Sequence, residues 1–299
     1  MNYAATIAGA AACVRIATRV GMPVSTTHAI VGSLGAVGAV AYGWNGVNWA
    51  AFGGKIAAPL LISPIASLAL TAMLLRLWRT SAPSGGDGSD CICMEADPVP
   101  HLPSAARSEA AVARPGLPTI RIFTGTQQVC ATTRPLVLRL TINHLHWVTS
   151  GATSFGRGLN DTPKMVALVL AAVALSSNAR ALTPAAFLSI ALGIVAGSWI
   201  AGGRVTTVLA EKVTRMDHRE GFVANLVTAA LVGPGAALGL PMSTTHVSSG
   251  AIIGAGILNG TGVNRRTVRE MVLAWILTLP AAAVLGVLAY ELLRIGRLA

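Results

Sequence analysis

The stretch Gly-Met-Pro-Val-Ser-Thr-Thr-His at residues 21–28 returns as Gly-Leu-Pro-Met-Ser-Thr-Thr-His at residues 239–246, with six of eight positions identical. In each copy a proline interrupts an apolar run, and three hydroxyl residues follow before the apolar pattern resumes. A break of this kind inside a membrane must satisfy its freed backbone groups with hydroxyl side chains or with a ligand. The duplication therefore predicts two broken helices, one in each half of the chain, around a shared central site.

The repeat continues downstream of both copies. Gly-Val-Asn at 46–48 matches Gly-Val-Asn at 262–264, and Leu-Ile-Ser-Pro-Ile-Ala at 61–66 matches Leu-Thr-Leu-Pro-Ala-Ala at 277–282. Many secondary transporters are built from two such related halves.

The distribution of basic residues indicates how the two halves are oriented in the membrane. The loop at 43–48 has no basic residue, whereas its counterpart at 259–270 carries Arg265, Arg266 and Arg269. Basic residues favour the cytoplasmic side, so equivalent loops are expected on opposite sides of the membrane. This predicts an inverted repeat with the 259–270 loop in the cytoplasm and the C-terminus outside, although two arginines at the tail argue weakly against it.

Composition places the chain in a membrane. Of its 299 residues 53% are hydrophobic and 11% are charged, where soluble proteins carry roughly a quarter charged residues. Several apolar stretches approach the ~20 residues that a membrane-spanning helix needs, and they lack the short alternation of outer-membrane barrels. We therefore predict an all-α polytopic membrane protein with an inverted repeat and broken or re-entrant helices. The apolar stretches cover residues 3–20, 24–42, 49–75, 165–176, 183–203, 221–238, 247–258 and 271–293.

The net charge of +11 does not indicate a nucleic-acid partner. Lys and Arg lie at the ends of apolar spans and in one polar segment rather than on one face, which is the pattern of a protein oriented in a lipid bilayer. We expect a multi-pass integral membrane protein of the bacterial inner membrane. A homodimer is one assembly that we consider.

Residues 80–140 separate the two membrane halves, 1–79 and 141–299. This segment is rich in Pro, Ser, Gly and charge, and we expect a polar cytoplasmic linker. Its Cys91 and Cys93 could bind a metal together with Cys130 and His101, but the spacing matches no standard zinc pattern.

Asp161 is the acidic residue at the start of the apolar run that follows Thr-Pro-Lys. An ionisable group at membrane depth costs at least ~2.5 kcal/mol and by default marks an ion or substrate path. Asp161 and Pro163 also suit a helix start, so a half-helix beginning there would offer free N–H groups to an anion. The neighbouring Arg157 and Lys164 either neutralise Asp161 or attract an anion.

The Ser-Thr-Thr segments allow two interpretations. Hydroxyl groups donate and accept hydrogen bonds, so they can hold phosphate oxygens or a hard cation such as sodium, or they can simply cap helices. His28 and His246 are candidates either for proton acceptance or for hydrogen bonds that lock the broken backbone. The glycines of both halves are expected to allow close helix packing.

At these residues the chain resembles the inorganic phosphate transporter (PiT) family, whose members move phosphate with sodium or protons. Both Gly-x-Pro-x-Ser-Thr-Thr-His segments match, and Arg-Gly-Leu-Asn-Asp-Thr-Pro-Lys at 157–164 looks like the family's second Gly-Ala-Asn-Asp motif with Leu159 in place of Ala. The resemblance implies a phosphate and cation site, with no other cofactor. Its substrate-binding residues would be Asn160, Asp161, Ser243, Thr244 and Thr245 from one half, and Ser25, Thr26 and Thr27 from the other; Asp161, Ser243 and Thr244 are also the candidate sodium ligands.

The family's first Asn-Asp motif has no counterpart here. Asn160 precedes Gly239 by 79 residues, but only 20 residues precede Gly21. We expect either a fragment, a mis-started reading frame, or a short form that needs a partner. The resemblance therefore implies a phosphate:cation symporter, with a non-transporting remnant or assembly subunit as the alternative. An intramembrane protease is disfavoured, because the chain has one good membrane carboxylate and no His-Glu-x-x-His.

Overall fold

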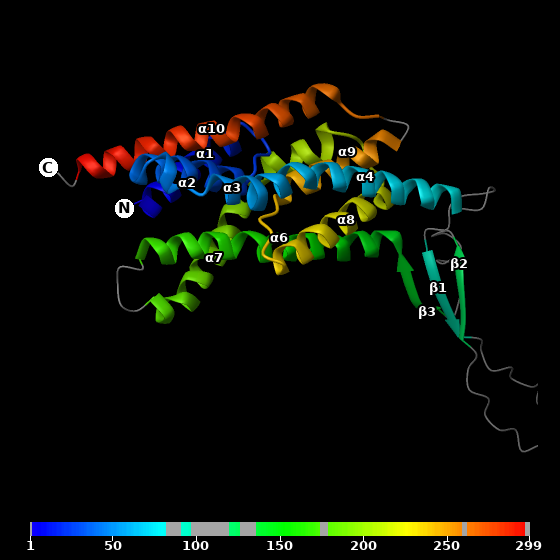
Figure 1. Ribbon diagram of the computed structural model, residues 1–299. Helices are drawn as coiled ribbons and strands as arrows, with labels where there is room; N and C mark the ends of the chain where they lie inside the picture. Colours follow the sequence, from blue (N-terminus) through cyan, green and yellow to red (C-terminus); the bar gives the residue numbers. More distant parts are fainter. Residues whose placement is uncertain are drawn as a thin grey trace, which may run out of the picture.

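The computed structural model describes residues 2–81, 91–96, 120–125, 136–173, 179–258 and 262–296. The membrane portion is helical, as predicted, and its long helices lie roughly side by side (Figure 1). The helices are α1 (Asn2–Arg19), α2 (Thr26–Tyr42), α3 (Trp49–Ala51), α4 (Ala58–Ser81), α6 (Ile142–Val173), α7 (Ala179–Thr207), α8 (His218–Ala237), α9 (Thr244–Leu258) and α10 (Arg265–Ile295). Shorter segments are the 3-10 turn η1 (Trp44–Gly46) and the π-helical η2 (Phe52–Ala57) and η4 (Val208–Lys212).

Three helical stretches are long and apolar enough to cross a membrane: Trp49–Thr80, Leu182–Lys212 and Arg265–Ile295. Helix α6 has 32 residues, which at 1.5 Å per residue gives about 48 Å and also exceeds a bilayer's hydrocarbon core. The chain is therefore a multi-pass helical membrane protein.

The four remaining long helices form two hairpins whose tips are broken at the prolines, as predicted. Helix α1 ends at Arg19 and α2 begins at Thr26, while α8 ends at Ala237 and α9 begins at Thr244. Gly21 and Gly239 adopt positive φ angles of 74° and 70° at the two breaks, a conformation that glycine adopts without steric cost.

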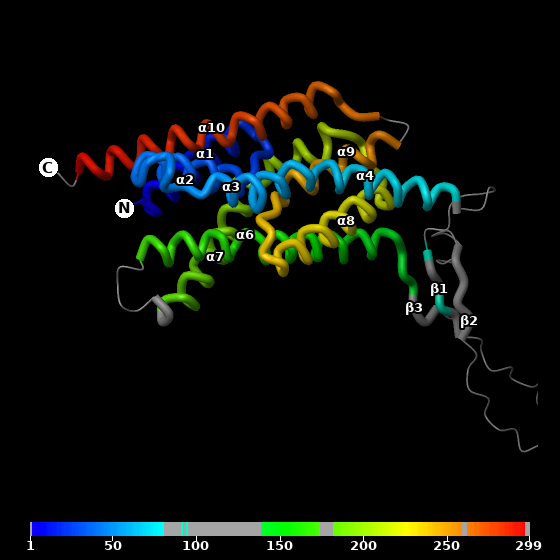
Figure 2. Tube along the Cα trace, viewed as in Figure 1, coloured from blue at the N-terminus to red at the C-terminus, as the bar shows by residue number. Residues whose placement is uncertain are grey.

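The two hairpins enter the bundle from opposite ends, as the tube in Figure 2 shows. At the open end of the first hairpin, Asn2 Nδ2 donates to Tyr42 Oη at 2.8 Å. At the other end of the bundle Arg79 of α4 donates to the carbonyl of Leu258 in α9 and lies 3.7 Å from the carboxylate of Glu220 in α8. The hairpin tips meet near the middle of the bundle.

The helices that follow the two broken tips pack in an interleaved way. Helix α2 packs on α10, and α9 packs on α4. A Cβ added at Gly32 would lie 2.4 Å from the Leu279 carbonyl oxygen, and one added at the duplicated position Gly250 would lie 2.2 Å from that of Pro64. Both glycines thus permit the close packing that was predicted for them.

The expectation that a half-helix begins at Asp161 is wrong. Helix α6 runs without a break from Ile142 to Val173, with Asp161 and Pro163 inside it. A proline removes one backbone N–H, but opening the helix in apolar surroundings would free several more polar groups. Continuing the helix is therefore the less costly arrangement.

The 80–140 segment contains strands as well as polar chain. Strands β1 (Cys91–Ala96), β2 (Ile120–Gly125) and β3 (Leu136–Thr141) form an antiparallel sheet in the order β2-β1-β3 beyond one end of the bundle (Figure 1). Each strand is only six residues long, so the surrounding Pro, Ser and Gly dominate the composition. Cys91 is buried, and the other suggested ligands Cys130 and His101 lie outside the described residues.

Candidate functional site

The two hairpin tips hold each other by reciprocal hydrogen bonds. Thr27 Oγ1 donates to the carbonyl oxygen of Met242 at 3.1 Å, and Thr245 Oγ1 donates to that of Val24 at 3.2 Å. Thr27 and Thr245 occupy the same position of the repeat, as do Val24 and Met242. Reciprocal contacts between equivalent residues are what a local two-fold axis produces, so the sequence repeat brings its two copies together.

The serines of both tips cap the helices that follow. Ser25 Oγ accepts the N–H of His28, and Ser243 Oγ accepts the N–H of His246, both at 3.2 Å. This is the capping role that the sequence allowed, and it accounts for one orphan donor in each helix. The N-termini of α2 and α9 both lie at the hairpin tips, where their first amides and positive dipole ends favour an anion.

Asn160 connects α6 to the second tip. Its side chain is 3% exposed, and Nδ2 donates to Asp161 Oδ1 at 2.7 Å and to the Met242 carbonyl oxygen at 2.8 Å. Its Oδ1 is buried without a hydrogen-bond partner among the described residues. Buried acceptors are usually paired, so this oxygen is free to bind a donor or a cation that enters the site.

Asp161 and Lys164 lie one turn apart on α6. The Lys164 ammonium is 3.8 Å from Asp161 Oδ1, and it donates to Thr27 Oγ1 at 3.1 Å and to the Met242 carbonyl oxygen at 2.9 Å. Asp161 is buried, with 9% of its surface exposed. The carboxylate is thus linked through Asn160 and Lys164 to residues of both Ser-Thr-Thr tips.

The Met242 carbonyl was not foreseen, and it lies at the centre of these contacts. It accepts from Thr27, Asn160 and Lys164, although a carbonyl oxygen has two lone pairs. Three donors for two lone pairs leave donor capacity in excess. A site with surplus donors and two helix N-termini is suited to an anion.

The predicted residues therefore divide into three groups. Asn160 and Thr27 donate to the Met242 carbonyl, Asp161 accepts from Asn160, and Thr245 binds the opposite tip. Ser25 and Ser243 serve as caps. Thr26, which is half-buried, and Thr244, which is buried, occupy the first positions of α2 and α9.

Two histidines and a tryptophan pack between the tips. The rings of His28 and His246 lie 4.5 Å apart, and the ring of Trp275 from α10 lies 4.1 Å from that of His246. Trp275 Nε1 also donates to the Pro23 carbonyl oxygen at 3.0 Å. The histidine rings contact each other at a tilt of 51° across the interface between the tips, and Trp275, which no sequence signal marked, satisfies one carbonyl of the broken backbone.

Comparison with known proteins identifies the family. The family model described as the phosphate transporter family matches residues 1–286. The chain belongs to the phosphate transporter family. This is a family of transporters and not of enzymes, and the earlier resemblance is confirmed.

Two relatives and one solved structure illustrate the likeness. The chain is 26% identical to a phosphate permease of Pyrococcus abyssi over 317 residues, which cover 97% of the chain and 77% of the relative. It is 28% identical to the chloroplastic inorganic phosphate transporter 2-1 of Arabidopsis thaliana, covering 95% of the chain and 57% of the relative. Its fold matches a structure described as the sodium-dependent phosphate transporter, with a TM-score of 0.72, 21% identity, and coverage of 98% of this chain and 79% of that one.

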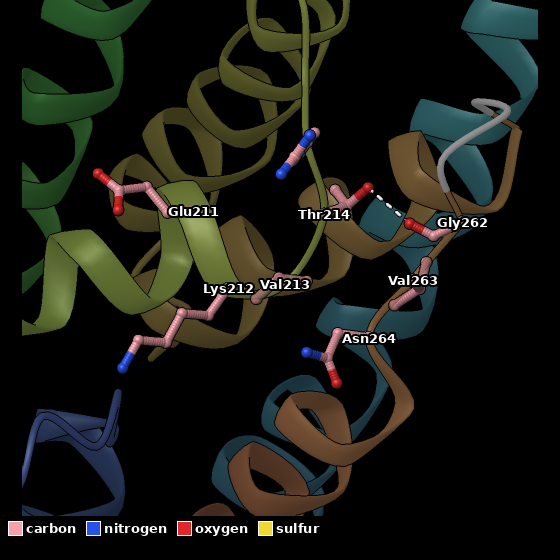
Figure 3. A pocket seen from close by; sticks show the side chains of 8 residues that line it. Glu211, Lys212, Val213, Thr214, Gly262, Val263 and Asn264 are labelled. Atoms are coloured by element: carbon pink, nitrogen blue, oxygen red, sulfur yellow. Dashed lines mark hydrogen bonds between the residues drawn. The ribbon is translucent and has the colours of Figure 1, made fainter.

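This phosphate transporter family member also has a cavity of about 380 Å³, lined by residues 211–215 and 262–264. Figure 3 shows its lining residues at the end of η4, which carries Glu211 and Lys212, and on two loops, one before α8 and one that ends at Asn264 at the start of α10. The loops are joined by Thr214 Oγ1, which donates to the Gly262 carbonyl oxygen at 2.8 Å. This cavity shares no residue with the site around Met242.

Proposed function

We propose that the chain moves inorganic phosphate across the membrane together with a cation, sodium or a proton. The observation that carries this proposal is the surplus of donors at the Met242 carbonyl, beside the N-termini of two half-helices. Phosphate supplies the acceptors that these donors lack, and helix N-termini favour its negative charge. Family membership supports the same substrate.

The residues at the tips have distinct roles in this proposal. Asn160 and Thr27 donate to phosphate oxygens when phosphate displaces part of their bonding to Met242, and the amides that begin α2 and α9, at Thr26 and Thr244, add further donors. Asp161 holds positive charge next to the anion. For sodium, the oxygen ligands would come from Asp161, Ser243 and Thr244, since hard cations prefer oxygen.

The hairpins suggest how the site reaches both sides of the membrane. They enter from opposite ends and exchange reciprocal bonds, and we infer that they form an inverted repeat. In transporters of that construction one repeat rocks against the other around a central site. We also propose the bacterial inner membrane as the location and a homodimer as the assembly.

Uptake of labelled phosphate into proteoliposomes tests the proposal. The full chain should accumulate phosphate inside the liposomes when an inward sodium or proton gradient is imposed. Asp161→Asn should abolish accumulation, because the neutral amide lacks the negative charge that attracts a cation. Asp217→Asn is the matched control. It makes the same chemical change at the cap of α8, where Asn is an equally good cap, and should transport normally.

Equal uptake by Asp161→Asn and the unchanged chain would remove Asp161 from the mechanism. Absence of uptake by the unchanged chain under both gradients would contradict transport by this polypeptide, and would favour an assembly subunit or a remnant.

A further inference from the structure

The Lys164 ammonium is surrounded by three different kinds of oxygen. It donates to a carbonyl oxygen (Met242, 2.9 Å) and a hydroxyl oxygen (Thr27, 3.1 Å), and it lies 3.8 Å from the Asp161 carboxylate. Carbonyl, hydroxyl and carboxylate oxygens are the ligands that hard cations take in proteins. The oxygens that would hold a free cation at this point therefore hold a lysine instead.

The number of N–H donors on the Lys164 ammonium also matches the number of oxygens around it. An ammonium has three N–H donors and no acceptor, and three oxygens face it. The side chain is mostly buried, with 22% of its surface exposed. Because Lys164 lies one turn after Asp161 on an unbroken helix, its charge is tethered beside the carboxylate.

We propose that the ammonium of Lys164 is the resident cation of the central site, so that phosphate binding by this chain does not require sodium. The inference rests on the proposed function, since it concerns how that same site neutralises phosphate and Asp161. It assigns to Lys164 a role that a separate ion would otherwise fill. The lysine also adds one of the donors that exceed the capacity of the Met242 carbonyl.

The proposal predicts how removal of the Lys164 side chain changes the cation requirement of the site. Lys164→Ala leaves the buried Asp161 carboxylate without its charge partner and opens a space next to three oxygens. A sodium ion or a small ammonium ion can occupy that space. The variant is thus expected to acquire a cation requirement that the unchanged chain lacks.

The experiment measures binding of labelled inorganic phosphate to the purified full chain in lipid nanodiscs, by scintillation proximity. Binding is compared in sodium chloride and in N-methyl-glucamine chloride at equal ionic strength. The unchanged chain should bind with the same affinity in both, within about twofold. Lys164→Ala should bind about tenfold or more weakly without sodium, and sodium or methylammonium should restore most of the loss.

Lys212→Ala is the matched control, because Lys212 lines the cavity formed by residues 211–215 and 262–264 and not the site around Met242. It should behave as the unchanged chain in both buffers. Restoration by added cations also separates the proposed role from a structural one, since a variant damaged only in its packing would gain nothing from sodium or methylammonium.

The outcomes separate the two proposals. A sodium requirement in the unchanged chain would overturn the inference and leave the proposed function intact, and this measurement needs no variant. A folded Lys164→Ala that stays weak with both cations would also overturn it. No phosphate binding by the unchanged chain in either buffer would instead contradict the proposed function itself.

Discussion

Met242 contributes its backbone to the site and its side chain to the core. The side chain packs with Val232 and Val247, while the carbonyl oxygen accepts from three donors. Packing therefore fixes the direction of the carbonyl, because a buried side chain limits the rotation of the peptide that carries it. A hydrophobic residue becomes a polar part of the site through its main chain.

Asn160→Ala should weaken phosphate binding about tenfold or more. The change removes the amide that Asp161 Oδ1 accepts and one donor to the Met242 carbonyl, and a lost hydrogen bond that leaves a buried acceptor such as this carboxylate unmatched costs about 1–3 kcal/mol. Phosphate affinity is measured by binding to the purified chain, and stability by thermal unfolding in detergent.

Asn225→Ala provides the comparison for this prediction. Asn225 Nδ2 joins α8 to α6 through Ser150 Oγ at 2.8 Å, away from the tips. Its loss should lower stability by a similar amount without changing phosphate affinity. A parallel fall in affinity for both variants would show that Asn160 acts only through the packing of α6.

At the scale of elements, α2 and α9, the helices that follow the two breaks, depend on backbone contacts that only glycine allows. Gly32→Ala and Gly250→Ala should each destabilise the protein by about 1–3 kcal/mol, because the new methyl group meets a carbonyl oxygen at 2.4 Å or 2.2 Å. The melting temperature in detergent checks this, and both variants should fall. Gly193→Ala in α7 has no atom within 4 Å of the added Cβ, so it should be neutral or slightly stabilising, and a comparable loss there would refute the packing argument.

The elements also show what the sequence could predict and what it could not. The breaks at Pro23 and Pro241 were predictable, since the motif repeats and hydroxyl residues stand ready as caps. The same logic failed at Pro163, because one proline costs an embedded helix less than a break would. A proline within an apolar run is present in both cases, and the packing around the helix decides whether the helix breaks there.

The contacts of the site were less predictable than its residues. Asp161 was predicted from its chemistry and Asn160 from the family resemblance, but Lys164 allowed two roles, and its bond to Met242 joins residues 78 positions apart. Any residue has a carbonyl, so no sequence signal marks the one that collects three donors. The tertiary packing of α6 against the tips decides that.

At the scale of the whole molecule, the two ends of the bundle differ in charge. The end where α4 closes and α10 begins carries Arg79, Arg265, Arg266 and Arg269, whereas η1 at the other end carries no basic residue. The linker leaves from the arginine-rich end, so the linker and the loop before α10 lie on the same side. The positive-inside rule predicts that this end faces the cytoplasm.

Thiol labelling tests this orientation and with it the inverted repeat. In a chain whose cysteines are replaced by Ala, single cysteines are placed at Trp44, at Arg266 and at Thr80, all of which are exposed. A membrane-impermeant maleimide should label Trp44→Cys only from outside, and Arg266→Cys and Thr80→Cys only from the cytoplasmic side, in membranes of known orientation. Trp44 and Arg266 belong to equivalent loops of the two halves, so labelling of both from one side would mean that the halves run parallel. In that case the hairpins could not approach the site from opposite faces, and rocking of one half against the other would not expose it alternately.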